Sequence, residues 1–370
     1  QEETVGVEEV VVIGYGTQEA RDATGAVSSV KAEDFNTGVI ASPEQLIQGK
    51  AAGVQITQAS GEPGAGINIR IRGTSSVRSN NNPLFVVDGV PLAGDNVSGG
   101  GADAGFGSSA ARNPLNFLNP NDIASIDILK DASATAIYGA RGANGVVLIT
   151  TKSGKAGEST LNYSANVGIS NITRKYDLLN AEEFVDAYAD VNNLSAGDPA
   201  LEGLDLGADT DWQDEIFRTA ITQNHNISYG GGNENGQYRF SLGYTDQEGI
   251  VERSSLQRLS ARFNGSTSFI DDRLTISTQI TISDVRDSFA PISDNAGATG
   301  DLLGMALKLN PTYPVRNPDG TLFQRSVTEA SPVAFLELGR DNANTVRALG
   351  NVTFDFAITD DLSFKTILGG

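Results

Sequence analysis

The sequence contains no cysteine, a single histidine and a single methionine among its 370 residues. Without thiols it can form no disulfide framework, and with one imidazole it offers neither a Cys/His zinc site nor the usual cysteine or histidine nucleophile machinery. Nor does any other set of residues combine a nucleophile, a base and a metal site. We therefore expect no catalytic residue, no metal, no cofactor and no enzyme.

Positive charge is also scarce. Lys and Arg number 26 against 46 Asp and Glu, which gives a formal net charge of -20 and a pI near 4.4. A chain this acidic is repelled by nucleic-acid phosphates, so nucleic acid is not expected as a partner.

Long apolar runs are missing as well. No stretch of eighteen or more apolar residues occurs, which excludes a helical membrane span. A transmembrane β-barrel stays possible, because its strands alternate apolar and polar residues and keep the average hydropathy low. The mean hydropathy of -0.19 permits this architecture.

The chain divides into three zones, which we place at residues 1–19, 20–155 and 156–370. The first is a short acidic leader with an apolar run. The second is a glycine-rich α/β region, for which short β-branched runs predict strands. These expected strands are Val54–Thr57, Ile67–Arg72, Leu84–Val90, with a turn at Asp88-Gly89, Ser125–Lys130 and Val146–Thr151.

Two short helices are expected in the second zone. Ser42 is followed by Pro43 and by Gln45 at the third helical position, which is a capping pattern and predicts a helix over Pro43–Lys50. A second helix is expected over Asp131–Tyr138, ended by Gly139.

The third zone has the two-residue period of half-buried strands. Leu161, Tyr163, Ala165, Val167 and Ile169 alternate with polar or small residues. The same alternation recurs in four later stretches of membrane-spanning length, namely Tyr238–Tyr244, Leu259–Phe263, Leu274–Ile282 and Val352–Ile358.

The connections favour a barrel over a soluble sandwich. Short turns at residues 231–236, 271–273 and 359–361 alternate with longer links, two of which, at 171–221 and 284–345, are very long. Outer-membrane barrels place short turns on one side and long loops on the other. About seven strands can be counted, and open edges are not tolerated in lipid, so further strands are expected beyond this sequence.

Several segments resemble one family in order and spacing. Residues 118–152, LNPNDIASIDILKDASATAIYGARGANGVVLITTK, are similar almost word for word to the plug signature of SusC-like (SusC/RagA) TonB-dependent outer-membrane transporters. Further matches are TGAVSSV (24–30), IQGKAAGVQ (47–55), INIRIRGT (67–74), PLFVVDGVP (83–91) and TDWQDEIFRTAITQNHN (210–226).

This resemblance implies the fold class and the function. The fold would be a membrane β-barrel of the 22-stranded plugged type, incomplete in this chain, with an N-terminal α/β plug domain inside the lumen. The protein would sit in the outer membrane of a Gram-negative bacterium, in contact with its lipid. It would import a glycan or a peptide with a SusD-like surface lipoprotein, using energy from TonB with ExbB and ExbD. The alternative is an outer-membrane receptor, signal transducer or structural component without transport.

The family position makes the first apolar run a candidate TonB box. A mobile, β-prone segment can add to the edge of a TonB sheet through its backbone. The alternative is an ordinary first strand of the plug. A dinucleotide-binding fingerprint is excluded, because its third glycine would fall on Glu19. The candidate residues are Glu8, Glu9, Val10, Val11, Val12, Ile13, Gly14 and Tyr15.

Other candidates concern the plug. Arg70 and Arg72 alternate with isoleucines on one strand, and the resemblance implies that Arg72 and Arg141 pair with acids of the barrel wall. The alternative is a pair of solvated strand charges. Ser79, Asn80, Asn81 and Asn82 offer hydrogen bonds to a polar ligand, or else form a turn-rich loop.

Three features of the third zone are interpreted as structural. His225 lacks a nucleophile partner. The acidic loop with Asp205, Asp209, Asp211 and Asp214 misses the spacing of a calcium loop and is expected to be solvated. Asn180 and Glu183 predict a capped helix over Ala181–Val191 inside an extracellular loop.

Overall fold

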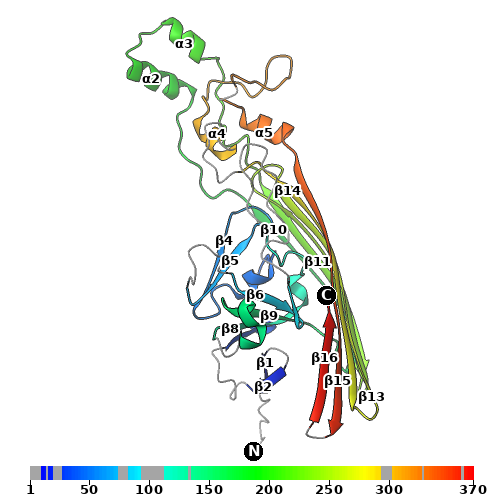
Figure 1. Cartoon of the computed structure of the whole chain (residues 1–370). Coiled ribbons are helices and arrows are strands. Elements are labelled where there is room, and N and C mark those ends of the chain that lie inside the picture. Colours follow the sequence, from blue (N-terminus) through cyan, green and yellow to red (C-terminus); the bar gives the residue numbers. More distant parts are fainter. Residues whose placement is uncertain are drawn as a thin grey trace, which may run out of the picture.

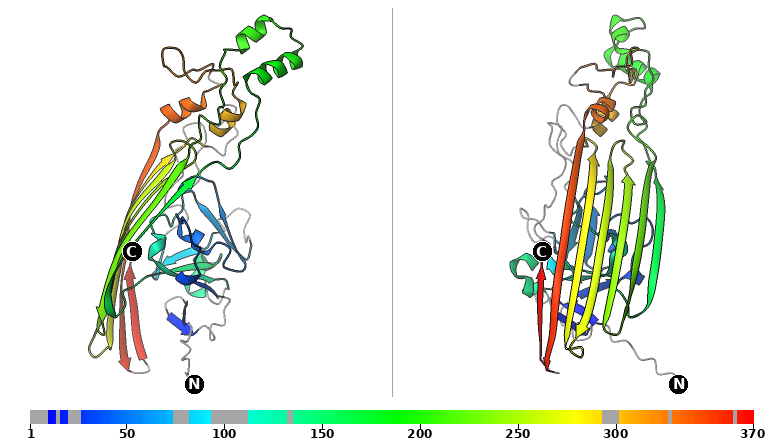
Figure 2. Two further views of the ribbon diagram at one scale, coloured as in Figure 1. Left: turned by 180° about the vertical axis from the view of Figure 1, so that it is seen from behind. Right: turned by 90° about the vertical axis from the view of Figure 1, so that its right-hand side faces the viewer.

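The protein has two main parts in its computed structural model, which describes residues 10–13, 16–19, 27–73, 82–92, 112–131, 135–292, 302–326, 329–359 and 362–370. A small α/β unit lies against the concave face of a tall curved sheet (Figure 1). We call the unit formed by residues 27–152 the plug and the seven-stranded sheet the wall. Helices and loops extend beyond one end of the wall, at the top of Figure 2.

The plug is built on a five-stranded sheet of order β3-β8-β9-β6-β7, in which only β6 and β9 are parallel. A separate antiparallel pair, β4 and β5, packs beside it. Isoleucine, leucine, valine and phenylalanine side chains from both sheets form one core, with Ile69 and Ile123 fully buried. The strands are β3 (Val27–Lys31), β4 (Val54–Gln58), β5 (Ile67–Ile71), β6 (Leu84–Val87), β7 (Val90–Pro91), β8 (Ile123–Leu129) and β9 (Val146–Thr151).

The expected plug strands are confirmed, with boundaries that differ by a few residues. The run Leu84–Val90 is split into β6 and β7 because Asp88 and Gly89 have φ of +48° and +84°, the left-handed values of a two-residue hairpin turn. The strand expected over Ile67–Arg72 ends at Ile71, since Arg72 has φ of +57° and leaves the extended conformation.

The first expected plug helix is a short 3-10 helix rather than an α-helix. Helix η2 (Pro43–Ile47) has the predicted capping box, with Ser42 and Gln45 bonded to each other's backbone, but it ends three residues early. Of the second expected helix, residues 132–134 lie outside the described residues and Thr135 is helical. The chain continues as the 3-10 helix η4 (Ala136–Gly142), which Gly139 interrupts with φ of +58°. Two further 3-10 turns are η1 (Ala32–Asp34) and η3 (Pro120–Asp122).

The wall is a meander in which each strand pairs antiparallel with the next along the chain. Its strands are about as long as a tilted membrane-spanning strand needs to be. They are β10 (Gly157–Ser170), β11 (Ala220–Asn233), β12 (Gly236–Glu248), β13 (Ser255–Phe269), β14 (Leu274–Phe289), β15 (Asp341–Thr359) and β16 (Leu362–Gly369).

The two faces of the wall have opposite polarity. Apolar side chains point away from the plug, so that Tyr163 is 64% exposed and Phe240 is 42% exposed. Polar side chains such as Asn224 and Ser241 point toward the plug and are buried beneath it. This is the inverse of a soluble sandwich, which would bury its aromatic residues between two sheets. The expected barrel alternation is therefore confirmed.

Short and long connections lie at opposite ends of the wall (Figure 2). Residues 234–235 and 270–273 form tight turns, whereas the links 171–219 and 290–340 are long and carry helices. The two long links share a hydrophobic cluster around Trp212, Leu302 and Tyr313. The helices are α2 (Ala181–Asn192), with the predicted Asn180 and Glu183 cap, α3 (Pro199–Leu204), α4 (Leu302–Lys308) and α5 (Pro332–Leu338).

Among the described residues, no helix combines the length and the apolar character that crossing a bilayer requires.

The outward face yields a test of the wall. Ala261 lies mid-strand on the outward face of β13, and Gln257 lies on the same face near the strand end. In the full-length protein, Ala261→Arg should lower the free energy of unfolding in lipid vesicles by roughly 2–4 kcal/mol, whereas Gln257→Arg should lower it by about 1 kcal/mol or less. Urea titration would measure both. Equal effects of the two substitutions would contradict a lipid-facing surface.

Candidate functional site: the interface between plug and wall

The inner face of the wall meets the plug through polar side chains. Inward-pointing atoms such as Asn226 Nδ2, Ser241 Oγ and Ser283 Oγ have no hydrogen-bond partner among the described residues. Buried polar groups in a folded core are almost always paired. The contact between plug and wall therefore differs from an ordinary protein core. The buried inward positions include Thr222, Asn224, Asn226, Ser228, Ser241, Thr245, Ser260, Asn264, Thr281 and Ser283.

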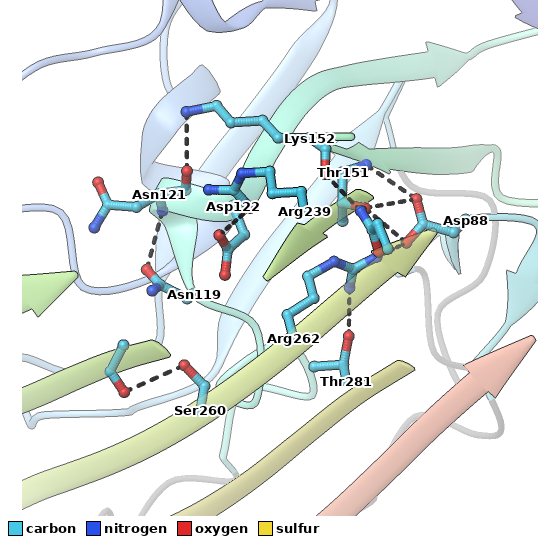
Figure 3. A network of polar contacts seen from close by, with 12 residues as sticks. Asp88, Asn119, Asn121, Asp122, Thr151, Lys152, Arg239, Ser260, Arg262 and Thr281 are labelled. Atoms are coloured by element: carbon cyan, nitrogen blue, oxygen red, sulfur yellow. Dashed lines mark hydrogen bonds and ion pairs between the residues drawn. The ribbon is translucent and has the colours of Figure 1, made fainter. Parts of the chain in front are cut away.

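Asp88, at the tip of the β6–β7 hairpin, is the centre of a polar cluster in this interface (Figure 3). Its carboxylate accepts hydrogen bonds from the Thr151 backbone N–H at 3.0 Å and from Thr151 Oγ1. It also forms an ion pair with Arg262 of β13, and both side chains are less than 7% exposed. The Arg262 guanidinium donates in addition to Thr281 Oγ1. The left-handed turn at Asp88 thus aims a plug carboxylate at the wall.

The same hairpin touches two other strands. Asn351 of β15 donates from Nδ2 to the Asp88 carbonyl at 2.6 Å. An ideal Cβ at Gly89 would lie 3.3 Å from Ile367 Cδ1 of β16, which is a tight approach. Asn264 of β13 donates to Thr151 Oγ1 at 3.2 Å. One plug hairpin and the end of β9 therefore contact three wall strands.

A second ion pair joins Asp122 of η3 to Arg239 of β12 at 2.7 Å, with both side chains mostly buried (Figure 3). Lys152 lies beside it and donates from Nζ to the Asn121 carbonyl at 2.9 Å. Burial lowers the pKa of Lys152, and the positive charge of Arg239 lowers it further. Two carboxylates of the plug thus pair with two arginines of the wall.

Two other wall arginines have no carboxylate partner among the described residues. Arg258 of β13 is fully buried and donates to the carbonyls of Ala41 and Asn116 at 3.2 and 3.1 Å, and to Thr245 Oγ1 at 2.9 Å. Arg347 of β15 donates to the Pro114 carbonyl at 2.8 Å. The Arg347 guanidinium also lies 4.8 Å from the centroid of the Phe117 ring. Neither guanidinium group forms an ion pair among the described residues.

In one contact the cation lies on the plug and the carboxylate lies on the wall. Arg112 of the plug lies 3.6 Å from the Asp287 carboxylate of β14, and its guanidinium stacks over the Phe289 ring at 3.8 Å. Burial lowers the pKa of Arg112, and the Asp287 charge opposes this shift. Burial also raises the pKa of Glu62, against the positive charge of Arg112.

The plug arginines chosen from the sequence make other contacts. Arg72 forms an ion pair with Asp131 of the plug itself. Arg141 donates from Nη2 to the Leu92 carbonyl at 2.6 Å, and Arg70 is half-buried with no partner for Nη1 among the described residues. Their proposed pairing with wall acids stays a prediction, because the seven strands described are only part of a barrel.

The interface residues that sequence reasoning missed are the wall arginines. Arg258 and Arg262 are four residues apart on β13, and Arg239 occupies an inward position of β12, so all three fall on the polar side of the alternation. Their position on the polar face of the strands was the feature of the sequence that could have identified them. The carboxylates that pair with Arg239 and Arg262 lie more than a hundred residues away in the sequence, where no local pattern indicates them.

The candidate TonB box is described in part. Val10–Ile13 form β1, which pairs antiparallel with β2 (Gly16–Glu19) in a two-stranded sheet separate from the plug sheet. Glu8, Glu9, Gly14 and Tyr15 lie outside the described residues, as do Ser79, Asn80 and Asn81. Asn82 is described, and its carbonyl accepts a hydrogen bond from Asn144 at 3.4 Å.

The features interpreted as structural make local contacts. His225 Nδ1 lies 2.9 Å from Tyr163 Oη at the exposed face of β10 and β11. In the acidic loop, Lys175 pairs with Asp211 and Asp214, and Asp209 accepts from the Ala181 N–H at the start of α2. No group of three or more potential metal-binding side chains occurs in the described part of the chain.

The buried ion pair suggests a test of the interface. Asp88→Ala should lower the stability of the plug by roughly 3–5 kcal/mol, because it leaves the buried Arg262 charge unpaired. Adding Arg262→Met should restore part of the loss. Arg286→Met, which removes an exposed pair with Asp284, is the control and should cost about 1 kcal/mol or less. Native-state hydrogen exchange of β8 and β9 amides would measure these changes. A double variant no more stable than the single one would contradict the pairing.

Comparison with known proteins places the chain among the TonB-dependent receptors. Residues 19–146 match the TonB-dependent Receptor Plug Domain family. The whole chain is 37% identical, over 399 aligned residues, to the TonB-dependent receptor SusC of Bacteroides thetaiotaomicron and covers 37% of it. It is 38% identical over 360 residues to the TonB-dependent receptor P26 of Formosa agariphila and covers 34% of that protein. The chain thus spans about a third of the length of these relatives.

Solved structures agree with this placement. The match to the RagAB peptide importer in its open-open state covers 98% of this chain and 42% of the importer chain, with a TM-score of 0.79 and 26% identity. The ferric citrate transporter FecA shares the fold alone, with a TM-score of 0.55 and 14% identity. The described sheet is therefore part of a plugged barrel. The chain is similar over its whole length to the SusC-like TonB-dependent receptors, which are outer-membrane β-barrel proteins, and it contains the plug and part of the barrel wall.

Proposed function

We propose that the protein imports a large nutrient, an oligosaccharide or a peptide, across the outer membrane by an active, TonB-dependent mechanism, and that it is not an enzyme. The observation that carries this proposal is the polar contact between plug and wall. Ligand would bind above the plug, TonB would pull from below, and displacement of the plug would open a path along the wall.

The distribution of apolar contacts supports a plug that can move. Its main hydrophobic core consists of plug residues, and Leu349 is the one wall residue among the described side chains packed against it. Burying apolar area stabilises a contact by roughly 25 cal/mol per Å². Polar groups, by contrast, can exchange their partners for water when they separate. A polar interface therefore costs less to open than a dry one of equal area.

Energy coupling would use the segment Glu8–Tyr15, whose described part is strand β1 in a hairpin outside the plug sheet. We propose residues 1–19 as the leader with this TonB box, 20–155 as the plug and 156–370 as wall strands and loops. The partners would be TonB, with ExbB and ExbD, and a SusD-like surface lipoprotein. The names of the similar proteins, a SusC receptor and the RagAB peptide importer, support this assignment.

Removal of the coupling segment tests the proposal. Deletion of Glu8–Tyr15 from the full-length protein should abolish ligand uptake by cells, because TonB loses its backbone pairing partner. Ligand binding at the cell surface and insertion of the barrel should persist, since neither depends on this segment. Scrambling Glu2–Thr4 is the control and should leave uptake unchanged. Full uptake by the deletion variant would sink the proposal.

A disulfide lock tests movement of the plug. The Cβ of Val39 in the plug lies 3.4 Å from an ideal Cβ at Gly168 of β10, close to the lower end of the range of about 3.5–4.5 Å that a disulfide needs. The chain has no cysteine of its own, so this pair would react alone within it. The oxidised Val39→Cys/Gly168→Cys protein should lose uptake, and a reductant should restore it.

The matched control joins two wall strands. The Cβ of Ser159 in β10 lies 3.3 Å from an ideal Cβ at Gly231 of β11, so Ser159→Cys/Gly231→Cys should form a disulfide that leaves the plug free. Uptake by this variant should not respond to oxidation. Unimpaired uptake through the oxidised plug-to-wall lock would mean that the segment around Val39 stays in place during transport.

A further inference from the structure

Cations are concentrated on the inner face of the wall, although the chain as a whole has a net charge of -20. Four arginines point from the wall toward the plug. Arg239 and Arg262 are paired with plug carboxylates, whereas Arg258 and Arg347 form no ion pair among the described residues. Arg258 donates to neutral oxygens, and Arg347 donates to the Pro114 carbonyl and lies over the Phe117 ring. The plug therefore supplies fewer negative charges than this surface has positive ones.

The carboxylates on the same face do not cancel this excess. Asp287 lies beside Arg112 of the plug, and Asp355 lies 3.9 Å from Lys365 of β16. Asp341, at the start of β15, also attracts the positive charge of Arg112 electrostatically. These acids occupy the ends of the strands, while Arg239, Arg258, Arg262 and Arg347 lie between them.

Holding the plug does not by itself explain a charge at Arg258. The side chain is 2% exposed and its three hydrogen bonds all end on neutral oxygens. A neutral amide could donate to the same carbonyls, whereas a buried cation is strongly disfavoured unless it is paired. The carboxylate that interacts electrostatically with Arg258, that of Asp122, is already paired with Arg239, so Arg258 has no counter-ion of its own among the described residues. An ionisable residue inside a membrane protein that lacks its own counter-ion points to a role with a ligand.

The surroundings of these arginines indicate the chemistry of that ligand. On β12 the inward positions from Arg239 to Thr245, and on β13 those from Arg258 to Asn264, are all polar or glycine. Amides and hydroxyls suit a hydroxyl-rich chain, and the inward positions of these two stretches offer no apolar side chain to a peptide. Guanidinium groups bind carboxylate and sulfate through paired, charge-assisted hydrogen bonds.

We propose that the imported ligand is an anionic oligosaccharide, bearing carboxylate or sulfate groups, and that Arg258 and Arg347 select its charge along the path opened by displacement of the plug. This inference rests on the proposed import function. When the plug moves, Arg258 loses the Ala41 and Asn116 carbonyls and Arg347 loses that of Pro114. Both guanidinium groups then become free to bind an anion.

The test compares probes that differ in charge alone. Cells producing the full-length protein would be offered a short fluorescent oligogalacturonate, its methyl ester of the same length, and a sulfated oligosaccharide beside its desulfated form. At least one acid should enter roughly tenfold faster than its neutral counterpart, the size expected for one charge-assisted hydrogen bond. An acidic peptide should not enter.

Two variants locate the selectivity. Arg347→Gln, at a half-buried position, should reduce the ratio of acid uptake to neutral uptake several-fold. Arg258→Lys keeps the charge and should keep the preference. A preference unaltered by Arg347→Gln would overturn the assignment of this residue.

The remaining outcomes separate this inference from the import function. TonB-dependent uptake of neutral and acidic probes at equal rates, or of the acidic peptide instead, would overturn the inference and leave import standing. Uptake that persists after deletion of Glu8–Tyr15 would count against the import mechanism itself.

Discussion

The structure depends on one constraint, which is that the wall exposes its apolar face outward and buries its polar face beneath the plug. A lipid environment would solvate Tyr163, Phe240 and Leu242. It would offer no hydrogen-bond partner to backbone N–H and C=O groups, so every strand has to pair with a neighbour. The polar face in turn adds little to the hydrophobic core of the plug, against which Leu349 is the one described wall side chain that packs. The plug must therefore be stable on its own, and its separate core of isoleucine, valine and phenylalanine meets that requirement.

Because the contact between plug and wall is polar, its specificity comes from charges at defined positions. The Asp88-Gly89 turn projects a carboxylate to Arg262, and the η3 turn projects Asp122 to Arg239. Buried ion pairs contribute little net stability, since desolvation offsets their attraction, but they penalise any other orientation strongly. In this interface they orient the plug without sealing it to the wall.

The long links form a third unit beyond the end of the wall. Trp212 from the first link and Leu302, Met305 and Tyr313 from the second are buried together. Trp212 Nε1 also donates to the Asn310 carbonyl at 3.0 Å, which joins the two links through a buried hydrogen bond. The plug, the wall and these links thus have distinct means of stabilisation.

By itself, the sequence determined those features whose physical cause is local. Alternation with a period of two assigns each strand its two faces, the Asp88-Gly89 pair marks a hairpin, and Ser42 and Asn180 mark helix starts. The tertiary structure alone decided which charges meet. Arg239 and Asp122 are 117 residues apart and Arg262 and Asp88 are 174 apart, and their encounter depends on strand register and on where the plug sits. It also set the distribution of charge across the interface, with arginines mainly on the wall and acids mainly on the plug. A sequence pattern shows that a side chain is polar and inward, but it does not show which residue lies opposite.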